Sequence, residues 1–239
     1  MTVHLRVSRS GPGGGGRRFD RFEVEVEPGA TILDALLEIR RRLDPSLVVR
    51  HSCMHASCGT CGVLVDGREA LACDTRVAEL PGGRPIMVEP LSNQRVVADL
   101  ATDMVDFYAR FEPAGLPLVR GSETLPKAVP PPGMKAFGRF ESCIECGLCL
   151  SACPIARADR AYIGPAALAA AARVVAEPRG LDIGPVLALA AEPDSVWRCR
   201  DAMACTAVCP AAVEPARALL TLRRHVAWRG LKRLVRRGA

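Results

Sequence analysis

Eleven cysteines fall into three runs, and their spacing is the strongest constraint on what this chain of 239 residues can fold into. An odd number of cysteines argues against a closed set of disulfide bonds, and such short spacings favour metal ligation. The N-terminal residues MTVHLRVSRS show no apolar signal-peptide core, so we expect thiols that stay reduced in the cytoplasm. The runs contain Cys53, Cys58, Cys61 and Cys73; Cys143, Cys146, Cys149 and Cys153; and Cys199, Cys205 and Cys209.

The first run has the spacing C-x4-C-x2-C with a later fourth cysteine, which is the plant-type ferredoxin pattern for a 2Fe–2S cluster. A loop that wraps such a cluster must bring its backbone close to the sulfur atoms. Gly59 and Gly62 permit this close approach, because glycine has no Cβ. We therefore predict Cys53, Cys58, Cys61 and Cys73 as the ligands of a 2Fe–2S cluster.

Two alternatives remain open for the first run. Structural zinc is one, although zinc sites favour paired short spacings that x4 does not match. A Rieske-type site is the other, because Cys53-Met54-His55 supplies C-x-H, but such a site needs a second histidine from another loop. The other histidines, none in such a context, are His4, His51 and His225.

The second run is the uninterrupted bacterial ferredoxin motif C-x2-C-x2-C-x3-C-P. In two-cluster ferredoxins the fourth cysteine of each run binds the other cluster. A 4Fe–4S cluster is therefore predicted at Cys143, Cys146, Cys149 and Cys209.

The second cubic cluster retains only Cys153, Cys199 and Cys205, because Ala202 stands where the third run would carry its second cysteine. A 3Fe–4S cluster needs only three thiolates, and this assignment leaves no cysteine unused. The alternative is a degraded 4Fe–4S site whose fourth ligand is water or a residue of a partner.

The first hundred residues show the alternation of a small α+β domain, which we place at residues 1–97. Thr31 is the expected helix N-cap, with Asp34 at the third helical position, and Asp66-Gly67 predicts a hairpin turn. The GPGGGG segment predicts a loop between the first two strands. Strands are predicted near residues 3–7, 22–26 and 85–90, and a helix over 32–43.

The remaining residues, 98–239, are predicted to form a mostly helical domain. No apolar run approaches the length that spans a membrane. Residues 211–239 contain eight basic residues and one acidic residue, so the last segment could face a membrane surface, nucleic acid or only water. The predicted segments are a helix over 96–111, an extended proline-rich connector over 113–133, an Ala-rich helix over 165–176 and a last amphipathic helix that includes Leu219, Leu222 and Val226.

The three runs together resemble the iron–sulfur subunit of succinate dehydrogenase and fumarate reductase. The resemblance covers nearly the whole chain. It implies a β-grasp plant-type ferredoxin domain followed by an α-helical bacterial-ferredoxin-like domain. The matching segments are RHSCMHASCGTCGVLVDGREALAC, CIECGLCLSACP followed by YIGPAAL, and VWRCRDAMACTAVCP.

The resemblance also implies a function and partners. A flavoprotein subunit with bound FAD oxidises succinate or reduces fumarate, and electrons pass through the 2Fe–2S, 4Fe–4S and 3Fe–4S clusters to a quinone. Transmembrane anchor subunits are expected to hold the chain on the cytoplasmic side of the cell membrane as a peripheral protein. No nucleic-acid partner and no catalytic acid, base or nucleophile are expected in this chain.

The resemblance implies quinone-proximal candidates at Pro154, Arg200 and Arg223. Relatives that use ubiquinone carry tryptophans soon after the position of Cys153, whereas this chain reads IARADRAYIGP without tryptophan. We therefore favour a menaquinone-linked type. Two other classes stay as alternatives, namely an iron–sulfur carrier subunit of another dehydrogenase and a zinc-structured interaction protein.

Overall fold

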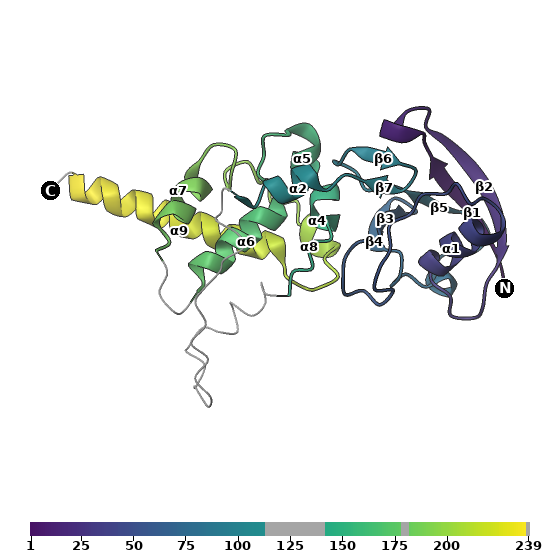
Figure 1. Ribbon diagram of the computed structural model, residues 1–239. Coiled ribbons are helices and arrows are strands. Elements are labelled where there is room, and N and C mark those ends of the chain that lie inside the picture. The colour runs from purple at the N-terminus through teal and green to yellow at the C-terminus, as the bar shows by residue number, and fades with distance from the viewer. Residues whose placement is uncertain (113–141, 178–181, 238–239) are drawn as a thin grey trace, which may run out of the picture. The chain divides into compact units, whose positions relative to one another are not determined.

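The computed structural model describes residues 1–112, 142–177 and 182–237 (Figure 1). The strands are β1 Thr2–Arg9, β2 Arg18–Glu25, β3 Gly62–Val65, β4 Arg68–Leu71, β5 Ile86–Glu89, β6 Val96–Ala98 and β7 Ala101–Thr102. The helices are α1 Ile32–Arg42, α2 Val105–Ala109, α4 Leu148–Ser151, α5 Pro154–Ala158, α6 Pro165–Val175, α7 Gly184–Ala191, α8 Ala204–Ala207 and α9 Pro215–Arg237, with short 3-10 turns at Pro12–Gly14 and Val77–Glu79. No helix in the described part of the chain is long and apolar enough to cross a membrane.

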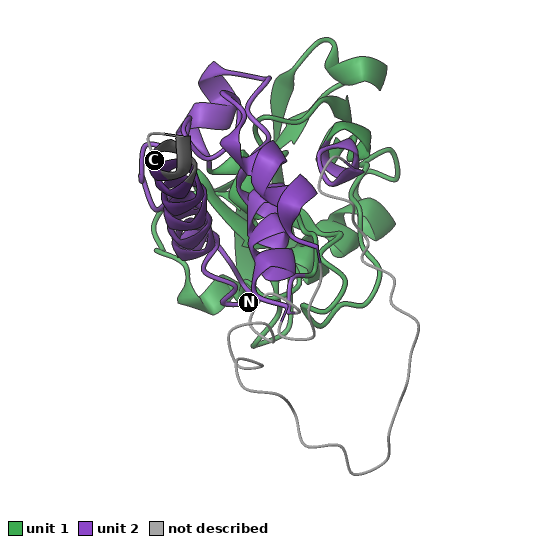
Figure 2. Ribbon diagram, turned by 90° about the vertical axis from the view of Figure 1, so that its left-hand side faces the viewer, with its two compact units in different colours: residues 1–106, 144–152 green, residues 107–143, 153–239 purple. Residues whose placement is uncertain are grey.

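The chain divides into two compact units, which are coloured separately in Figure 2. The first comprises residues 1–106 and 144–152. The second comprises the described residues of 107–143 and 153–239. The short segment 144–152, which carries α4 and most of the second cysteine run, therefore belongs to the N-terminal unit.

The first unit is built on a mixed five-stranded sheet in the order β2-β1-β5-β3-β4. β1 pairs parallel with β5, and the other neighbours are antiparallel. α1 begins with the predicted capping box, in which Thr31 Oγ1 accepts from the Asp34 N–H and Asp34 accepts from the Thr31 N–H. Its apolar face is fully buried, and the predicted turn between β3 and β4 is confirmed, since Asp66 and Gly67 both have positive φ.

A buried guanidinium ties β1 to two loops of the first unit. Arg9 is 4% exposed; it hydrogen-bonds Asp44 and Ser46 and lies 3.1 Å from an Asp99 oxygen. Asp99 in turn accepts from the backbone N–H groups of Ser10 and Val48, both at 2.8 Å. The charged groups therefore have their partners inside the protein.

The predicted helix over 96–111 is wrong for most of its length. Residues 96–102 form the β6–β7 hairpin, with Asp99 at its turn in the left-handed region (φ 45°), and only α2 is helical. The reason is tertiary, because hydrogen bonds from Ser10 and Val48 fix the Asp99 carboxylate in the turn. The predicted connector over 113–133 lies outside the described residues.

The second unit is helical, as predicted. α6 and α7 pack on α9, and the shared core contains Leu168, Leu187 and Leu222, all of them buried (Figure 1). Pro165 occupies the first turn of α6, where its missing N–H leaves no helical hydrogen bond unmade. Two very short helices carry or adjoin cysteines: α5 begins directly after Cys153, and α8 contains Cys205 and ends two residues before Cys209.

We predict that Arg9→Ala lowers the stability of the first unit by about 3–5 kcal/mol, because removal of one partner leaves buried carboxylates without a counter-charge. Urea unfolding of the iron-loaded chain, followed by circular dichroism, measures this loss. Arg21→Ala removes an exposed arginine from β2 and serves as the control, for which we expect little change. An equal effect of both substitutions would contradict a structural role of the Arg9 network.

Candidate iron–sulfur centres

The loop of the first cysteine run directs backbone N–H groups at sulfur atoms. Cys53 Sγ lies 3.3 Å from the N–H groups of both Ser57 and Cys58, and the Ala56 N–H donates to Cys73 Sγ at 3.2 Å. Cys61 and Cys73 bring their sulfur atoms to 3.3 Å. This donor pattern suits thiolates that carry negative charge, so the residues present fit a 2Fe–2S cluster.

Two thiols of this loop differ in acidity. The Thr60 hydroxyl, 3.1 Å from Cys58 Sγ, is the main cause that lowers the pKa of Cys58 to about 6. Burial raises the pKa of the Cys61 thiol to about 12. The hydrogen bonds therefore favour the thiolate form of Cys58, whereas burial favours the thiol form of Cys61 until a metal displaces its proton.

The loop passes close to the second cysteine run, within the first unit. A Cβ placed on Gly59, which has φ 70°, would lie 2.8 Å from both the Cβ of Cys146 and the carbonyl oxygen of Ile144. Such distances exclude any side chain at this position. Gly59 is thus required both for its backbone conformation and for the approach of the two cysteine-bearing segments.

The second and third cysteine runs share one local backbone conformation. Two and four residues after the first cysteine of each run, Cys143 or Cys199, the chain enters the left-handed region. A four-residue helix then begins five residues after that cysteine, α4 in one run and α8 in the other. The positive φ angles are those of Glu145 (52°), Gly147 (78°), Asp201 (56°) and Met203 (57°).

This repeat gives Ala202 a structural equivalent. Ala202 follows Cys199 by three residues, as Cys146 follows Cys143. Because the backbone angles on both sides agree, the replaced cysteine does not reflect a shift in the loop. The third run has the shape of a four-cysteine motif in which one cysteine side chain is replaced by the methyl group of alanine.

Three cysteines of the second unit gather around a buried tyrosine. Tyr162 is 1% exposed, and its hydroxyl hydrogen-bonds the side chain of Cys199. Burial raises the pKa of Tyr162, and the nearby thiols of Cys199, Cys153 and Cys205 raise it further. Burial also raises the pKa of Cys205 to about 11, with contributions from Cys153 and Cys199. The three predicted 3Fe–4S ligands therefore share one neighbourhood.

Arg223 of α9 holds the start of the third run. Its two terminal nitrogens lie 3.1 and 3.2 Å from the Asp201 carboxylate oxygens. One of them also donates to the carbonyl oxygens of Cys199 (2.9 Å) and Val196 (3.1 Å). This fork geometry suits arginine and not lysine. Its charge opposes the effect of burial, which raises the pKa of Cys199.

The remaining predicted site residues lie as follows. Pro154 is exposed at the first turn of α5, directly after Cys153, and Arg200 is exposed in the third run. Cys146 and Cys149 belong to the first unit, and Cys143 and Cys209 belong to the second. Among the described residues no three cysteine, histidine or carboxylate side chains are arranged to hold a single metal ion.

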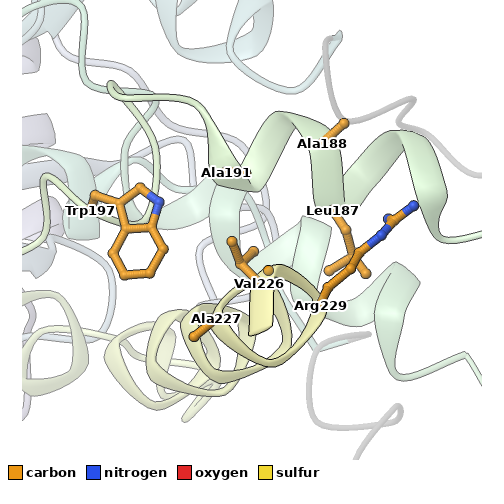
Figure 3. Close-up of a pocket in the computed structure, with 8 residues that line it drawn as sticks. Leu187, Ala188, Ala191, Trp197, Val226, Ala227 and Arg229 are labelled. Atoms are coloured by element: carbon orange, nitrogen blue, oxygen red, sulfur yellow. The ribbon is translucent and has the colours of Figure 1, made fainter. Parts of the chain in front are cut away.

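A largely apolar pocket of about 290 Å³ lies between α7 and α9 (Figure 3). Trp197, two residues before Cys199, forms one side, and Arg229 lies at the other. None of the three quinone-proximal candidates lines it. Its lining residues are Leu187, Ala188, Ala191, Trp197, Val226, Ala227, Arg229 and Gly230.

Two contributors to the site were missed by sequence reasoning. Tyr162 has no charge and no motif spacing that marks it, and only its burial beside three cysteines reveals it. Arg110, at the end of α2, donates to the carbonyl oxygens of Tyr162 and Arg160 and so fixes the turn that carries the tyrosine. Such long-range contacts leave no periodic trace in the sequence.

Comparison with protein families defines the class. Residues 4–109 match the family model of the 2Fe-2S iron-sulfur cluster binding domain. Residues 139–213 match that of the 4Fe-4S dicluster domain. The chain is therefore an α+β iron–sulfur protein with an N-terminal 2Fe–2S domain and a C-terminal 4Fe–4S domain.

Individual relatives narrow the class to one family. The chain is 35% identical to a fumarate reductase iron-sulfur subunit of Mycobacterium tuberculosis, over 91% of this chain and 89% of the relative. It is 34% identical to a succinate dehydrogenase iron-sulfur subunit of Paracoccus denitrificans, over 86% and 80%. A chain of the Mycobacterium smegmatis Sdh1 complex in the apo form superposes with a TM-score of 0.84 at 27% identity, over 95% and 96%. The chain belongs to the iron–sulfur subunits of the succinate dehydrogenase and fumarate reductase family of oxidoreductase complexes.

We predict that Tyr162→Phe lowers the reduction potential of the cluster that Cys199 is predicted to bind. A thiolate has no proton, so the tyrosine must donate the hydrogen bond, and this bond favours the more negative reduced state. Redox titration monitored by electron paramagnetic resonance measures the shift at unchanged iron content. Tyr108→Phe, at an exposed tyrosine of α2, is the control. An unchanged potential in Tyr162→Phe would show that the hydroxyl has no influence on the cluster.

Proposed function

We propose that this chain is the electron-transfer subunit of a membrane-bound complex that interconverts succinate and fumarate. Bound to its thiolates, the clusters would supply one-electron carriers between the FAD of a flavoprotein subunit and a quinone. The proposed ligands are Cys53, Cys58, Cys61 and Cys73 for 2Fe–2S; Cys143, Cys146, Cys149 and Cys209 for 4Fe–4S; and Cys153, Cys199 and Cys205 for 3Fe–4S. The work of the protein is to hold these ligands and to adjust the charge around them.

Membership of the family and the convergence of Cys153, Cys199 and Cys205 on Tyr162 carry this proposal. The equivalence of Ala202 and Cys146 supports a third site with only three thiolates. Arg223 supports the same site, because it fixes both the carbonyl of Cys199 and the carboxylate that follows it.

The finer features of the proposal rest on resemblance. The first domain would be a β-grasp plant-type ferredoxin domain over 1–97, and the second an α-helical bacterial-ferredoxin-like domain over 98–239. The sheet order with β1 parallel to β5 supports the first assignment. Transmembrane anchor subunits would hold the chain as a peripheral protein on the cytoplasmic side of the membrane.

We propose menaquinone as the acceptor type and the surface of Pro154, Arg200 and Arg223 as the side that faces it. Pro154 and Arg200 are exposed and directly follow two of the three proposed 3Fe–4S ligands. Their position shortens the path from cluster to acceptor. The segment between Cys153 and α6 contains no tryptophan, which supports the menaquinone type.

The test of this function is the metal content and its response to Ala202→Cys. We expect about nine iron atoms per anaerobically purified chain and a 3Fe signal in the oxidised state by electron paramagnetic resonance. Ala202→Cys restores the missing thiolate, so we expect about ten iron atoms, loss of the 3Fe signal and a lower potential of the last cluster.

Ala188→Cys adds an exposed thiol on α7, outside the three cysteine runs, and should leave iron content and signal unchanged. A wild-type value near ten without a 3Fe signal would reject the 3Fe–4S assignment and favour a 4Fe–4S site with a different fourth ligand. Persistence of the 3Fe signal in Ala202→Cys would show that Ala202 does not face the vacant corner.

We further predict that Arg223→Ala, in the assembled complex, lowers quinone-linked turnover about tenfold, since charge-assisted hydrogen bonds of this kind are worth about 1.5–3 kcal/mol. Electron transfer from succinate to an artificial acceptor should stay at the wild-type rate. The quinone-linked rate, the artificial-acceptor rate and the iron content are measured on the same preparation. Arg217→Ala, at an exposed residue of the same helix, is the control.

If Arg223→Ala keeps the wild-type rate of quinone-linked turnover, Arg223 is not part of the surface that faces the acceptor. A loss of iron with a fall in both rates would instead confine Arg223 to holding the loop of the third run. Arg223→Lys separates charge from geometry, because lysine keeps the charge but cannot form the fork to Asp201.

A further inference from the structure

The C-terminal turns of α9 carry apolar side chains on their outer face. Trp228, Leu231 and Val235 are 60%, 52% and 65% exposed. At about 100° per residue they cover about 60° of the helix circumference. The buried Leu222 and Val226 lie on the opposite side, so α9 packs against α6 and α7 with a different face. We call Trp228, Leu231 and Val235 the outer face of α9.

This arrangement departs from the usual pattern of a helix at the surface of a globular protein, where the apolar stripe faces the core and the outer side is polar. α9 has a buried stripe and a second apolar stripe in solvent. Figure 1 shows these turns extending beyond α6 and α7 in the second unit. Three large apolar side chains gathered on one exposed helix face, and not scattered singly, mark a candidate contact site.

Positive charge surrounds the outer face. Lys232 Nζ lies 5.3 Å from the Trp228 ring centroid, and Arg224 is exposed one turn earlier. The sequence after Glu214 has no acidic residue. Its basic residues are Arg217, Arg223, Arg224, Arg229, Lys232, Arg233, Arg236 and Arg237.

We propose that the outer face of α9 binds directly to the surface of an anionic lipid bilayer. Trp228, Leu231 and Val235 enter the boundary between headgroups and acyl chains, and the neighbouring cations contact lipid phosphates. The inference rests on the proposed peripheral location of the chain and adds lipid itself as a partner. The outer face of α9 would then attach the chain to the membrane directly, in addition to any anchor subunit.

The chemistry of the face favours lipid over other partners. The apolar core of a protein interface is depleted in lysine, whereas here Lys232 lies over the central tryptophan. Nucleic acid would use the cations but gives no reason for exposed Leu231 and Val235. A tryptophan beside aliphatic side chains and cations is the composition of an interfacial helix.

The test is sedimentation of the full iron-loaded chain with vesicles of phosphatidylcholine and phosphatidylglycerol, under anaerobic conditions. Leu231→Gln/Val235→Gln should weaken binding at least about tenfold, because two side chains lose their insertion into lipid. Glutamine keeps a high helix propensity, so α9 should stay folded. Trp228→Gln should act in the same direction.

The chain offers a matched control. Leu43→Gln/Val105→Gln replaces the same two residue types, with comparable exposure, in the first unit. This variant should bind as the wild type does. Vesicles of phosphatidylcholine alone should bind at least about tenfold more weakly, since each cation near an anionic leaflet contributes about fivefold.

Equal binding of the outer-face variant and the control variant would overturn the proposal, as would a wild-type chain that sediments with neither kind of vesicle. If the outer-face variant instead loses co-purification with a membrane protein, the face belongs to a protein partner. If it changes the size of the free chain in solution, the face joins two copies. Iron content and the 3Fe signal, measured on the same samples, report separately on the proposed electron-transfer function.

Discussion

The geometry that iron ligation demands of a short loop is the constraint on which most of this structure depends. In the described chain ten residues other than glycine have positive φ, and five of them lie in the cysteine-bearing loops 53–61, 143–153 and 199–209. They are Met54, Ala56, Glu145, Asp201 and Met203. Each costs about 1–2 kcal/mol relative to a relaxed backbone, so the surroundings must hold it in place. In the third run Arg223 supplies that hold, through Asp201 and the Cys199 carbonyl.

The sequence predicted those structural elements that depend only on residues close to one another in the chain. The capping box at Thr31 and Asp34 and the Asp66-Gly67 turn need only neighbouring residues, and both are present. The 96–111 segment shows the limit of this reasoning. Its apolar spacing is compatible with a helix, but the turn at Asp99 is determined by hydrogen bonds from Ser10 and Val48, far away in the sequence.

The same division applies to the site. Cysteine spacing alone leads to the prediction of three ligand sets, because ligation restricts which residue types can stand at which intervals. Spacing could not identify Tyr162, whose role depends on burial against three thiols. Nor could it show that Arg223 bonds to the backbone of the third run, since that contact joins residues more than twenty positions apart. The residues that support the ligands are determined by their position in the folded chain, and they follow no fixed spacing in the sequence.

The membership of residues 144–152 in the first unit has a consequence for biogenesis. Within that unit Ser151 donates to Glu69 and accepts from the Ser92 N–H, and Asn93 donates to the carbonyls of Leu150 and Ser151. A nascent chain that has emerged only to residue 106 lacks these partners. Domains generally fold as units during synthesis. The first unit therefore cannot complete its contacts until a segment encoded well after its own sheet has been synthesised, so residues of the second unit are made before the first unit is complete.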